Sequence, residues 1–162
     1  MSRIINPMDA LKSFEPALMR GELSVEPGRT NAEVFVHQDF PNGEVRYSYG
    51  KMRGAFVGAL AIIVPAQAVG SIHAFQIGYA VPQHLRKRGL AKEITKAAID
   101  EFTFGMARHG VKCFYIEAIV GVKNVASQYV AAHVIGGEPK RTYDNESGEP
   151  AFQYLKLIEI AA

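Results

Sequence analysis

The stretch YAVPQHLRKRGLAKEI, residues 79–94, contains the transition around which this chain is organised. An apolar, strand-like run stops at Pro82, three basic residues follow at 86–88, and a helical pattern begins after Gly89. Three interpretations of this basic turn are open at this point. It is solvated surface charge, a nucleic-acid patch, or a cradle for a phosphate-bearing ligand.

The start of the helix after this turn has the properties of an anion site. The first turn of a helix leaves backbone N–H groups without partners, and the helix dipole is positive there. Gly89 allows a ligand to approach the backbone closely, and the small Ala91 keeps the next position open. Arg86, Lys87 and Arg88 add positive charge. The spacing matches neither the GxxxxGK[ST] phosphate loop nor the GxGxxG dinucleotide motif.

Hydrophobic periodicity predicts the order helix, four strands, helix, strand, helix, two strands. The helices are expected at residues 8–20, 90–106 and 124–134, and the strands at 33–38, 45–49, 55–64, 71–81, 111–120, 138–143 and 151–159. Pro16 interrupts the first helical pattern, so one bent helix or two short ones are expected. This order predicts an α/β (α+β) fold with crossover helices and excludes a helix bundle or a β-sandwich.

Turn signals organise the front half of the chain into an antiparallel meander. The pair Asn42-Gly43 favours positive φ and predicts a hairpin between the first two strands. Residues 66–70 are expected to be a connection rather than part of a strand.

Length and composition limit the class of protein. The 162 residues, 48% apolar and 21% charged, are typical of one globular domain spanning 1–162. The net charge of +2 confines any nucleic-acid surface to a local patch, so nucleic acid is not the expected partner. Cys113, the single cysteine, is expected to be a buried structural thiol, and no Cys/His spacing resembles a metal site. No secretory signal or membrane span is found, which predicts a soluble, cytoplasmic protein.

The basic turn resembles the pyrophosphate motif of the GNAT superfamily of N-acetyltransferases. That motif, [QR]-x-x-G-x-[GA], follows a strand, and the matching residues here are Arg86, Lys87, Arg88, Gly89, Leu90 and Ala91, five residues after Val81. A second match is N-x-x-[AS] before a helix, at Asn124 and Ser127. The order of elements agrees with the family from about residue 32 to residue 159.

The resemblance implies a fold and a cofactor. The fold is a mixed, mostly antiparallel central sheet of about six to seven strands flanked by helices, in which the fourth and fifth strands splay apart. The cofactor is acetyl-CoA, with no metal. Its pyrophosphate is expected on the amides of the motif, and its pantetheine amides along Tyr79, Ala80 and Val81, where they satisfy backbone groups that the splay leaves unpaired. The implied activity is direct acetyl transfer to a primary amine of a small molecule, protein or peptide.

The residues that would handle protons depart from the family pattern. Gln76 stands where relatives often carry a glutamate base, and Ala131 stands where they often carry a tyrosine acid. Tyr129 is a weak substitute, because it is expected on a different face of the helix. Glu117, inside an apolar strand, must be partnered or face a cleft. We therefore take Glu117, Gln76 and Tyr79 as the candidate catalytic residues.

Other functions stay open. The departures at Gln76 and Ala131 also fit a regulatory module that binds acetyl-CoA without catalysis. The basic turn also fits an acetyltransferase acting on aminoacyl-tRNA, although the nearly neutral charge argues against it. The acceptor is undetermined, with residues 8–31 and 138–150 as the expected walls of its site. Late strands offer edges for a homodimer.

Overall fold

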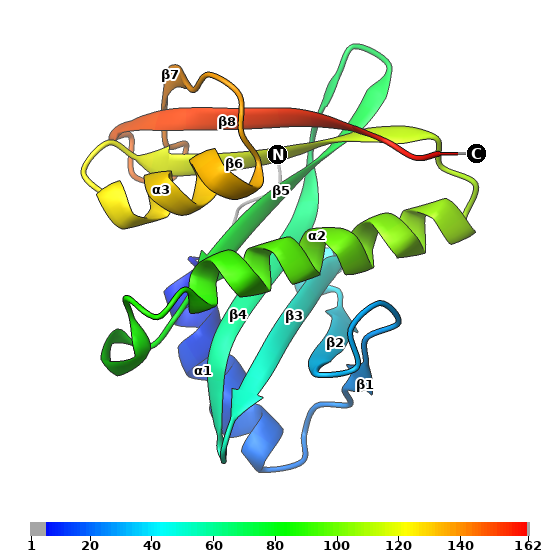
Figure 1. Cartoon of the computed structure of the whole chain (residues 1–162), viewed down its shortest axis with the longest axis vertical. Coiled ribbons are helices and arrows are strands. Elements are labelled where there is room, and N and C mark those ends of the chain that lie inside the picture. Colours follow the sequence, from blue (N-terminus) through cyan, green and yellow to red (C-terminus); the bar gives the residue numbers. More distant parts are fainter. Residues whose placement is uncertain (1–5, 162) are drawn as a thin grey trace.

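The computed structural model describes residues 6–161 and places eight strands of this range in one sheet (Figure 1). The strands are β1 (Glu26–Pro27), β2 (Val34–Asp39), β3 (Arg46–Arg53), β4 (Phe56–Val69), β5 (Ile72–Ala80), β6 (Cys113–Gly121), β7 (Lys140–Tyr143) and β8 (Pro150–Glu159). Their order across the sheet is β1-β2-β3-β4-β5-β6-β8-β7. Every neighbouring pair is antiparallel except β5 and β6. The expected mixed sheet is confirmed. Strand β1 was not predicted, because a strand of two residues has no recognisable hydrophobic pattern.

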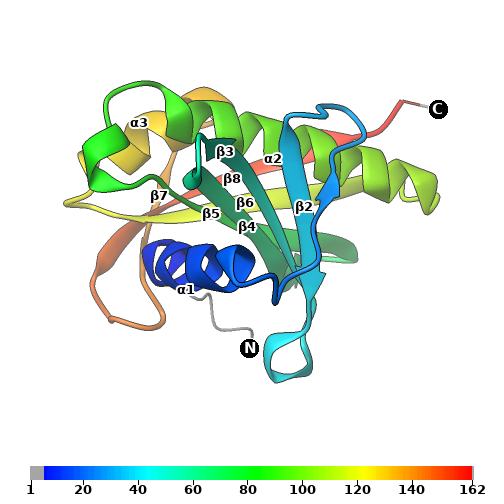
Figure 2. The ribbon, with the colours of Figure 1, turned by 90° about the horizontal axis from the view of Figure 1, so that it is seen from below.

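Helices cover both faces of this sheet. They are α1 (Pro7–Met19), α2 (Leu90–Arg108) and α3 (Val125–Val134), and short 3-10 turns lie at Pro41–Gly43 and Gln83–Leu85. Figure 2 shows α2 and α3 on one face and α1 on the other. None of the helices within residues 6–161 is long and apolar enough to cross a membrane.

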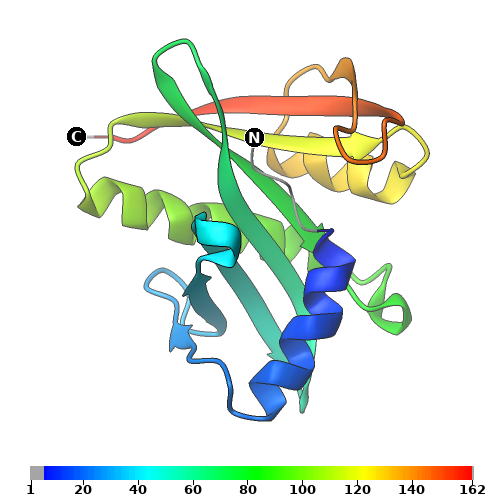
Figure 3. The same cartoon turned by 180° about the vertical axis from the view of Figure 1, so that it is seen from behind.

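Helix α1 is a single helix in spite of Pro16. Asn6 caps its start, because the Asn6 side chain accepts hydrogen bonds from the amides of Met8 and Asp9. Pro16 removes one intrahelical hydrogen bond, but it is exposed and leaves the buried face intact. That face packs on β4 and β5 (Figure 3). The alternative of two short helices is therefore wrong.

The hairpins agree with the turn signals in one case and differ in the other. Asn42 and Gly43 have φ values of 56° and 83°, and β2 pairs with β3 around them, so the first hairpin is confirmed. The expected connection at residues 66–70 is wrong, because β4 continues to Val69 and turns at Gly70. The long β4–β5 hairpin projects beyond β8 in Figure 1. It keeps its strand pairing as far as Val69 and Ile72.

Each face of the sheet carries its own apolar core. On the α2 face, the ring of Phe102 packs edge-on against Phe75, Phe114 and Tyr47, with centroids 4.7, 5.3 and 5.5 Å away. On the other face, Phe14 of α1 stacks on Phe35 at 5.5 Å. The alternating burial of β6, with every second residue buried, places that strand between a covered and a more open face.

A buried carboxylate fixes the segment that leads into β2. Glu101 of α2 is 6% exposed and accepts hydrogen bonds from the amides of Arg29, Thr30 and Asn31, at 2.9, 2.7 and 2.8 Å, and from the Thr30 hydroxyl at 2.7 Å. A Cβ at Gly28 would lie 2.3 Å from its Oε1. Burial alone raises the pKa of Glu101, but these hydrogen bonds outweigh it and the pKa is lowered.

Strands β5 and β6 separate after a short parallel ladder. Their pairing is limited to Ala74 with Tyr115, Phe75 with Ile116, and Gln76 with Glu117. Beyond these pairs β5 continues to Ala80 and β6 to Gly121, but they no longer pair with each other. The fourth and fifth strands of the sequence pattern correspond to β5 and β6. The expected splay between them is therefore confirmed.

Candidate functional site

The gap between the separated strands opens into a cleft of about 1170 Å³. Its walls come from β5, β6, the turn after β5, the N-terminal parts of all three helices, and the turn after β7. The lining residues are Asn6, Pro7, Met8, Ile77, Gly78, Tyr79, Ala80, Val81, Leu85, Arg86, Lys87, Gly89, Leu90, Ala91, Lys92, Ala118, Ile119, Val120, Gly121, Asn124, Val125, Ala126, Ser127, Tyr129, Val130 and Asp144.

The start of α2 presents a row of free backbone amides to this cleft. The first hydrogen bond that closes a helical turn runs from the Glu93 amide to the Gly89 carbonyl at 3.0 Å, and no side chain caps the helix. The amides from Lys87 to Lys92 therefore have no partner among residues 6–161. Gly89, with φ 77°, and Lys87, with φ 64°, bend the chain so that this helix start lines the cleft. Free amides and the positive end of a helix dipole together attract an anion.

The three basic side chains of the turn have different positions. Arg86 folds back, and its Nε donates a hydrogen bond to the Val81 carbonyl at 3.3 Å, which closes the turn onto the end of β5. Lys87 lines the cleft, as does Lys92 one turn into α2. Arg88 is exposed and is not part of the lining. The positive charge of the cleft therefore comes from Arg86, Lys87 and Lys92.

Helix α3 contributes the opposite wall. Asn124 caps it, because its Oδ1 accepts the Ser127 amide at 3.1 Å. The Tyr79 hydroxyl of β5 donates a hydrogen bond to the Ser127 carbonyl at 2.7 Å, so it ties β5 to α3. Burial raises the pKa of Tyr79, and the neighbouring Tyr154 raises it further. Because this hydroxyl is already engaged and strongly holds its proton, its position suits a brace between the walls.

Gln76 and Glu117 lie opposite each other in the last parallel pair, at the narrow end of the splay. Neither residue is part of the cleft lining. Glu117 is half-buried, and its Oε2 accepts a hydrogen bond from the Gln153 amide of β8. The structure thus brings the two candidate residues together but gives Glu117 a partner on the neighbouring strand.

Sequence reasoning missed several residues of the cleft. Tyr129 was expected on another face of α3, but it lines the cleft, is 59% exposed, and its hydroxyl has no hydrogen-bond partner in the part of the chain described. The ring of His133 lies 4.0 Å from its ring. Pro7 also lines the cleft, as do Met8 and Asp144, which fall within the walls expected at residues 8–31 and 138–150 without being singled out there. No local motif marks these three, because they come from opposite ends of the chain.

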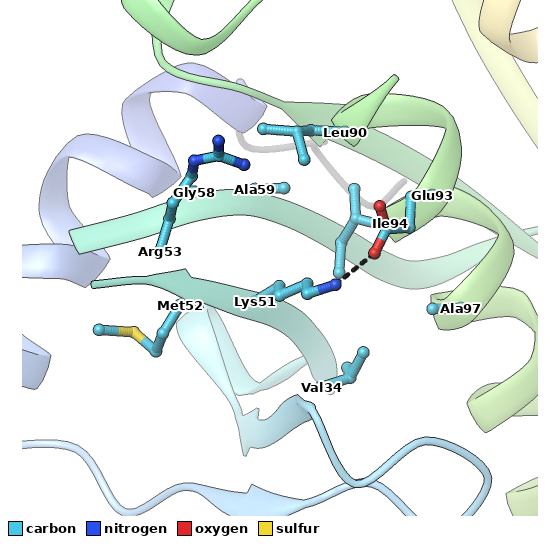
Figure 4. Close-up of a pocket in the computed structure, with 10 residues that line it drawn as sticks. All are labelled: Val34, Lys51, Met52, Arg53, Gly58, Ala59, Leu90, Glu93, Ile94 and Ala97. Atoms are coloured by element: carbon cyan, nitrogen blue, oxygen red, sulfur yellow. Dashed lines mark hydrogen bonds and ion pairs between the residues drawn. The ribbon is translucent and has the colours of Figure 1, made fainter. Parts of the chain in front are cut away.

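A second, smaller cavity of about 120 Å³ lies between the β3–β4 hairpin and α2 (Figure 4). Val34, Ala59 and Ile94 line it with apolar groups. At its rim the Lys51 ammonium pairs with the Glu93 carboxylate at 2.5 Å, which links β3 to the first turn of α2. The same ammonium also lies 3.5 Å from the Glu33 carboxylate. These contacts hold the first turn of α2 against β3.

Comparison of the whole fold with solved structures shows which proteins share it. An acetyltransferase of the GNAT family from Streptococcus pneumoniae aligns with a TM-score of 0.51 at 15% identity, over 70% of this chain and 67% of that chain. A putative acetyltransferase from Salmonella typhimurium with its cofactor acetyl-CoA aligns with a TM-score of 0.52 at 13% identity, over 98% and 76%. A chain of the NatC complex bound to Gag peptide and CoA aligns with a TM-score of 0.51 at 18% identity, over 72% and 71%.

The fold is therefore that of the GNAT acetyltransferases. No family model matches the sequence, and no curated protein matches it. At identities of 13 to 18% the likeness lies in the arrangement of helices and strands. Any assignment of activity to this chain depends on its own cleft.

Proposed function

We propose that this protein is an acetyl-CoA-dependent N-acetyltransferase that transfers the acetyl group to a primary amine. The observation that supports this most is the meeting of two features in one cleft. The unpaired amides from Lys87 to Lys92 suit a diphosphate, and the unpaired edges of β5 and β6 suit a chain of amides. Acetyl-CoA carries a diphosphate joined to a chain with two amides, so one molecule satisfies both.

In this proposal the cofactor runs from the start of α2 toward the narrow end of the splay. The diphosphate lies on the amides of residues 87–92, with Arg86, Lys87 and Lys92 balancing its charge. Pantetheine pairs with the free edge of β5 between Ile77 and Val81. Bound there, acetyl-CoA supplies an activated acetyl group as a thioester. Asn124 and Ser127 line the opposite wall, while Leu90 and Ala91 form part of the helix start.

The reaction needs a neutral amine and a stabilised leaving group. The amine nitrogen attacks the thioester carbon, the C–N bond forms, the C–S bond breaks, and the amine proton leaves to solvent. We assign protonation of the leaving thiolate to Tyr129, since its hydroxyl lies in the lining of the cleft and has no partner among residues 6–161. The resulting phenolate takes up a proton from solvent. Gln76 and Glu117 have a supporting position beside the narrow end, and Tyr79 braces the walls.

A second candidate function is an acetyl-CoA-binding module without catalysis. The observation in its favour is the position of Gln76 and Glu117, neither of which lines the cleft as a base would. The two functions agree on the cofactor and differ only in turnover.

The test is thiol release from acetyl-CoA in the presence of a panel of primary amines, together with calorimetric binding of acetyl-CoA. We expect binding, and thiol release that depends on at least one amine. Tyr129→Phe should lower kcat by about a hundredfold without weakening cofactor binding. Tyr143→Phe is the matched control, because Tyr143 is 68% exposed and outside the cleft lining. Binding without turnover for every amine supports the module, and absence of binding excludes both functions.

A further inference from the structure

The charges around the large cleft are separated by sign. Its cationic lining residues, Arg86, Lys87 and Lys92, all lie in or after the turn that leads into α2. The single carboxylate among the described lining residues is Asp144, in the turn between β7 and β8. A cleft made only for an anionic cofactor gains nothing from a carboxylate in its wall, because that charge repels phosphate. The opposite sign at this place calls for a second ligand.

The turn that contains Asp144 and the start of α1 both contribute to the lining of the cleft. Figure 2 shows the turn after β7 on the same side of the sheet as α1, whereas α2 and α3 lie on the other side. Pro7 and Met8 of α1 line the same cleft. Pro7 fits closely against β5, since a Cβ on Gly78 would lie 2.6 Å from its Cγ. The lining of the cleft thus extends to the start of α1 and to the β7–β8 turn.

The carboxylate of Asp144 is held in a fixed orientation. Its Oδ1 accepts the amides of Glu146 and Ser147 at 2.8 and 3.2 Å. The backbone of Asp144 pairs with Glu149 and Gly148 at 2.8 Å each. The second oxygen, Oδ2, has no hydrogen-bond or ionic partner among residues 6–161. A carboxylate with one oxygen anchored and one free is prepared to bind a cation.

From this geometry we propose that Asp144 is a specificity-determining residue for a cationic acceptor. The acceptor is an amine that carries a second positive charge away from the reacting nitrogen. In the cleft its distal charge pairs with Asp144 Oδ2. This inference rests on the proposed acetyl transfer, since that function supplies the reason for an amine in the cleft.

The experiment uses three amines of equal length that differ in the charge at the far end. These are 1,5-diaminopentane, pentylamine and 5-aminopentanoate. Protein saturated with CoA, as judged by calorimetry, is titrated with each amine, and the dissociation constant is measured by NMR. We expect the diamine to bind about tenfold more tightly than pentylamine, with 5-aminopentanoate weakest.

Two variants separate the role of Asp144 from general electrostatics. Asp144→Asn retains an oxygen for the Glu146 and Ser147 amides, so the turn is kept while the charge is lost. Glu146→Gln removes an equal charge from the same turn, on an exposed side chain outside the lining. We expect Asp144→Asn to abolish the preference for the diamine and Glu146→Gln to keep it, with unchanged affinity for CoA in both.

The outcomes are distinct. Equal binding of the three amines, no binding of any of them, or an equal loss of preference in both variants overturns the inference about Asp144. Those results leave the cofactor assignment intact as long as CoA binds. Failure of CoA to bind overturns the proposed function itself, before any amine is added.

Discussion

Glu101 shows how one residue can fix a segment that lacks regular structure. The carboxylate of this α2 residue is buried. The backbone amides of residues 29–31 donate hydrogen bonds to it in place of water. A buried charge that is this well hydrogen-bonded is stabilising, whereas a partly satisfied one is costly. The chain before β2 is therefore held against α2 by a single side chain.

Replacing Glu101 by Gln should lower the free energy of unfolding by about 2 kcal/mol, because one acceptor oxygen becomes a donor facing amides. The lowered pKa of Glu101 adds a dependence on pH. Its stabilisation is complete above the ordinary value of 4.5 and is lost as the pH falls through the lower folded value. Urea unfolding of both proteins between pH 3 and 7 should therefore show the difference shrinking in acid.

Asp100→Asn provides the comparison for this residue. Asp100 is the neighbouring carboxylate on α2, but it is exposed. The Asp100→Asn substitution should leave the free energy of unfolding and its pH dependence nearly unchanged. If Asp100→Asn lowers the free energy of unfolding as much as Glu101→Gln does, the negative charge on the helix, and not the hydrogen bonds of Glu101, is the cause of the stabilisation.

Individual residues also show how far the candidate site could be predicted from the sequence. Glu117 was expected to be partnered or to face a cleft, and its hydrogen bond with Gln153 confirms the first alternative. For Tyr79 and Tyr129 the sequence shows only two tyrosines near the site. Which hydroxyl is engaged depends on the distance from β5 to α3, a tertiary property that no local pattern records.

At the scale of elements, the start of α2 was predictable because local rules determine it. Gly89 has the positive φ that a glycine permits, and the absence of a cap leaves the amides free. The length of the β4–β5 hairpin was not predictable in the same way. Residues 66–69 carry no strand pattern of their own and extend because Ala66 pairs with Ala74 and Val69 with Ile72, with an irregular register between these pairs.

Gly89→Val tests the role of this helix start. The side chain would meet nothing within 4 Å in the free protein, so the fold should be retained with only backbone strain at φ +77°. It would occupy the space where a diphosphate approaches the amides. We expect calorimetry to show affinity for acetyl-CoA reduced by about a hundredfold or more.

Gly110→Val is the control at the other end of the same helix. Gly110 has φ +78° and an equally open surrounding, so the strain is matched, but it lies outside the cleft lining. Its affinity for acetyl-CoA should equal that of the unmodified protein. Equal affinity in Gly89→Val would contradict the placement of the diphosphate.

At the scale of the whole molecule, the order of elements predicted an α/β (α+β) fold, and the resemblance to the GNAT superfamily implied the mixed sheet and its splay. The acceptor side was not predictable to the same degree, because it joins the start of α1 to the turn after β7. These segments are distant in sequence and meet only through the topology of the sheet. Residues 8–31 and 138–150 were expected as walls, and Met8 and Asp144 are the lining residues that fall within them.

The central claim is that acetyl-CoA binds in the cleft between β5 and β6. Backbone hydrogen exchange, measured with and without acetyl-CoA, tests it most directly, since it reports on amides that have no partner within the described residues 6–161. We expect bound acetyl-CoA to slow exchange at residues 77–92 and 118–127, with no change at residues 29–31, which Glu101 already binds. Unchanged exchange at residues 87–92, or protection centred on residues 51–59 around the smaller cavity, would contradict it.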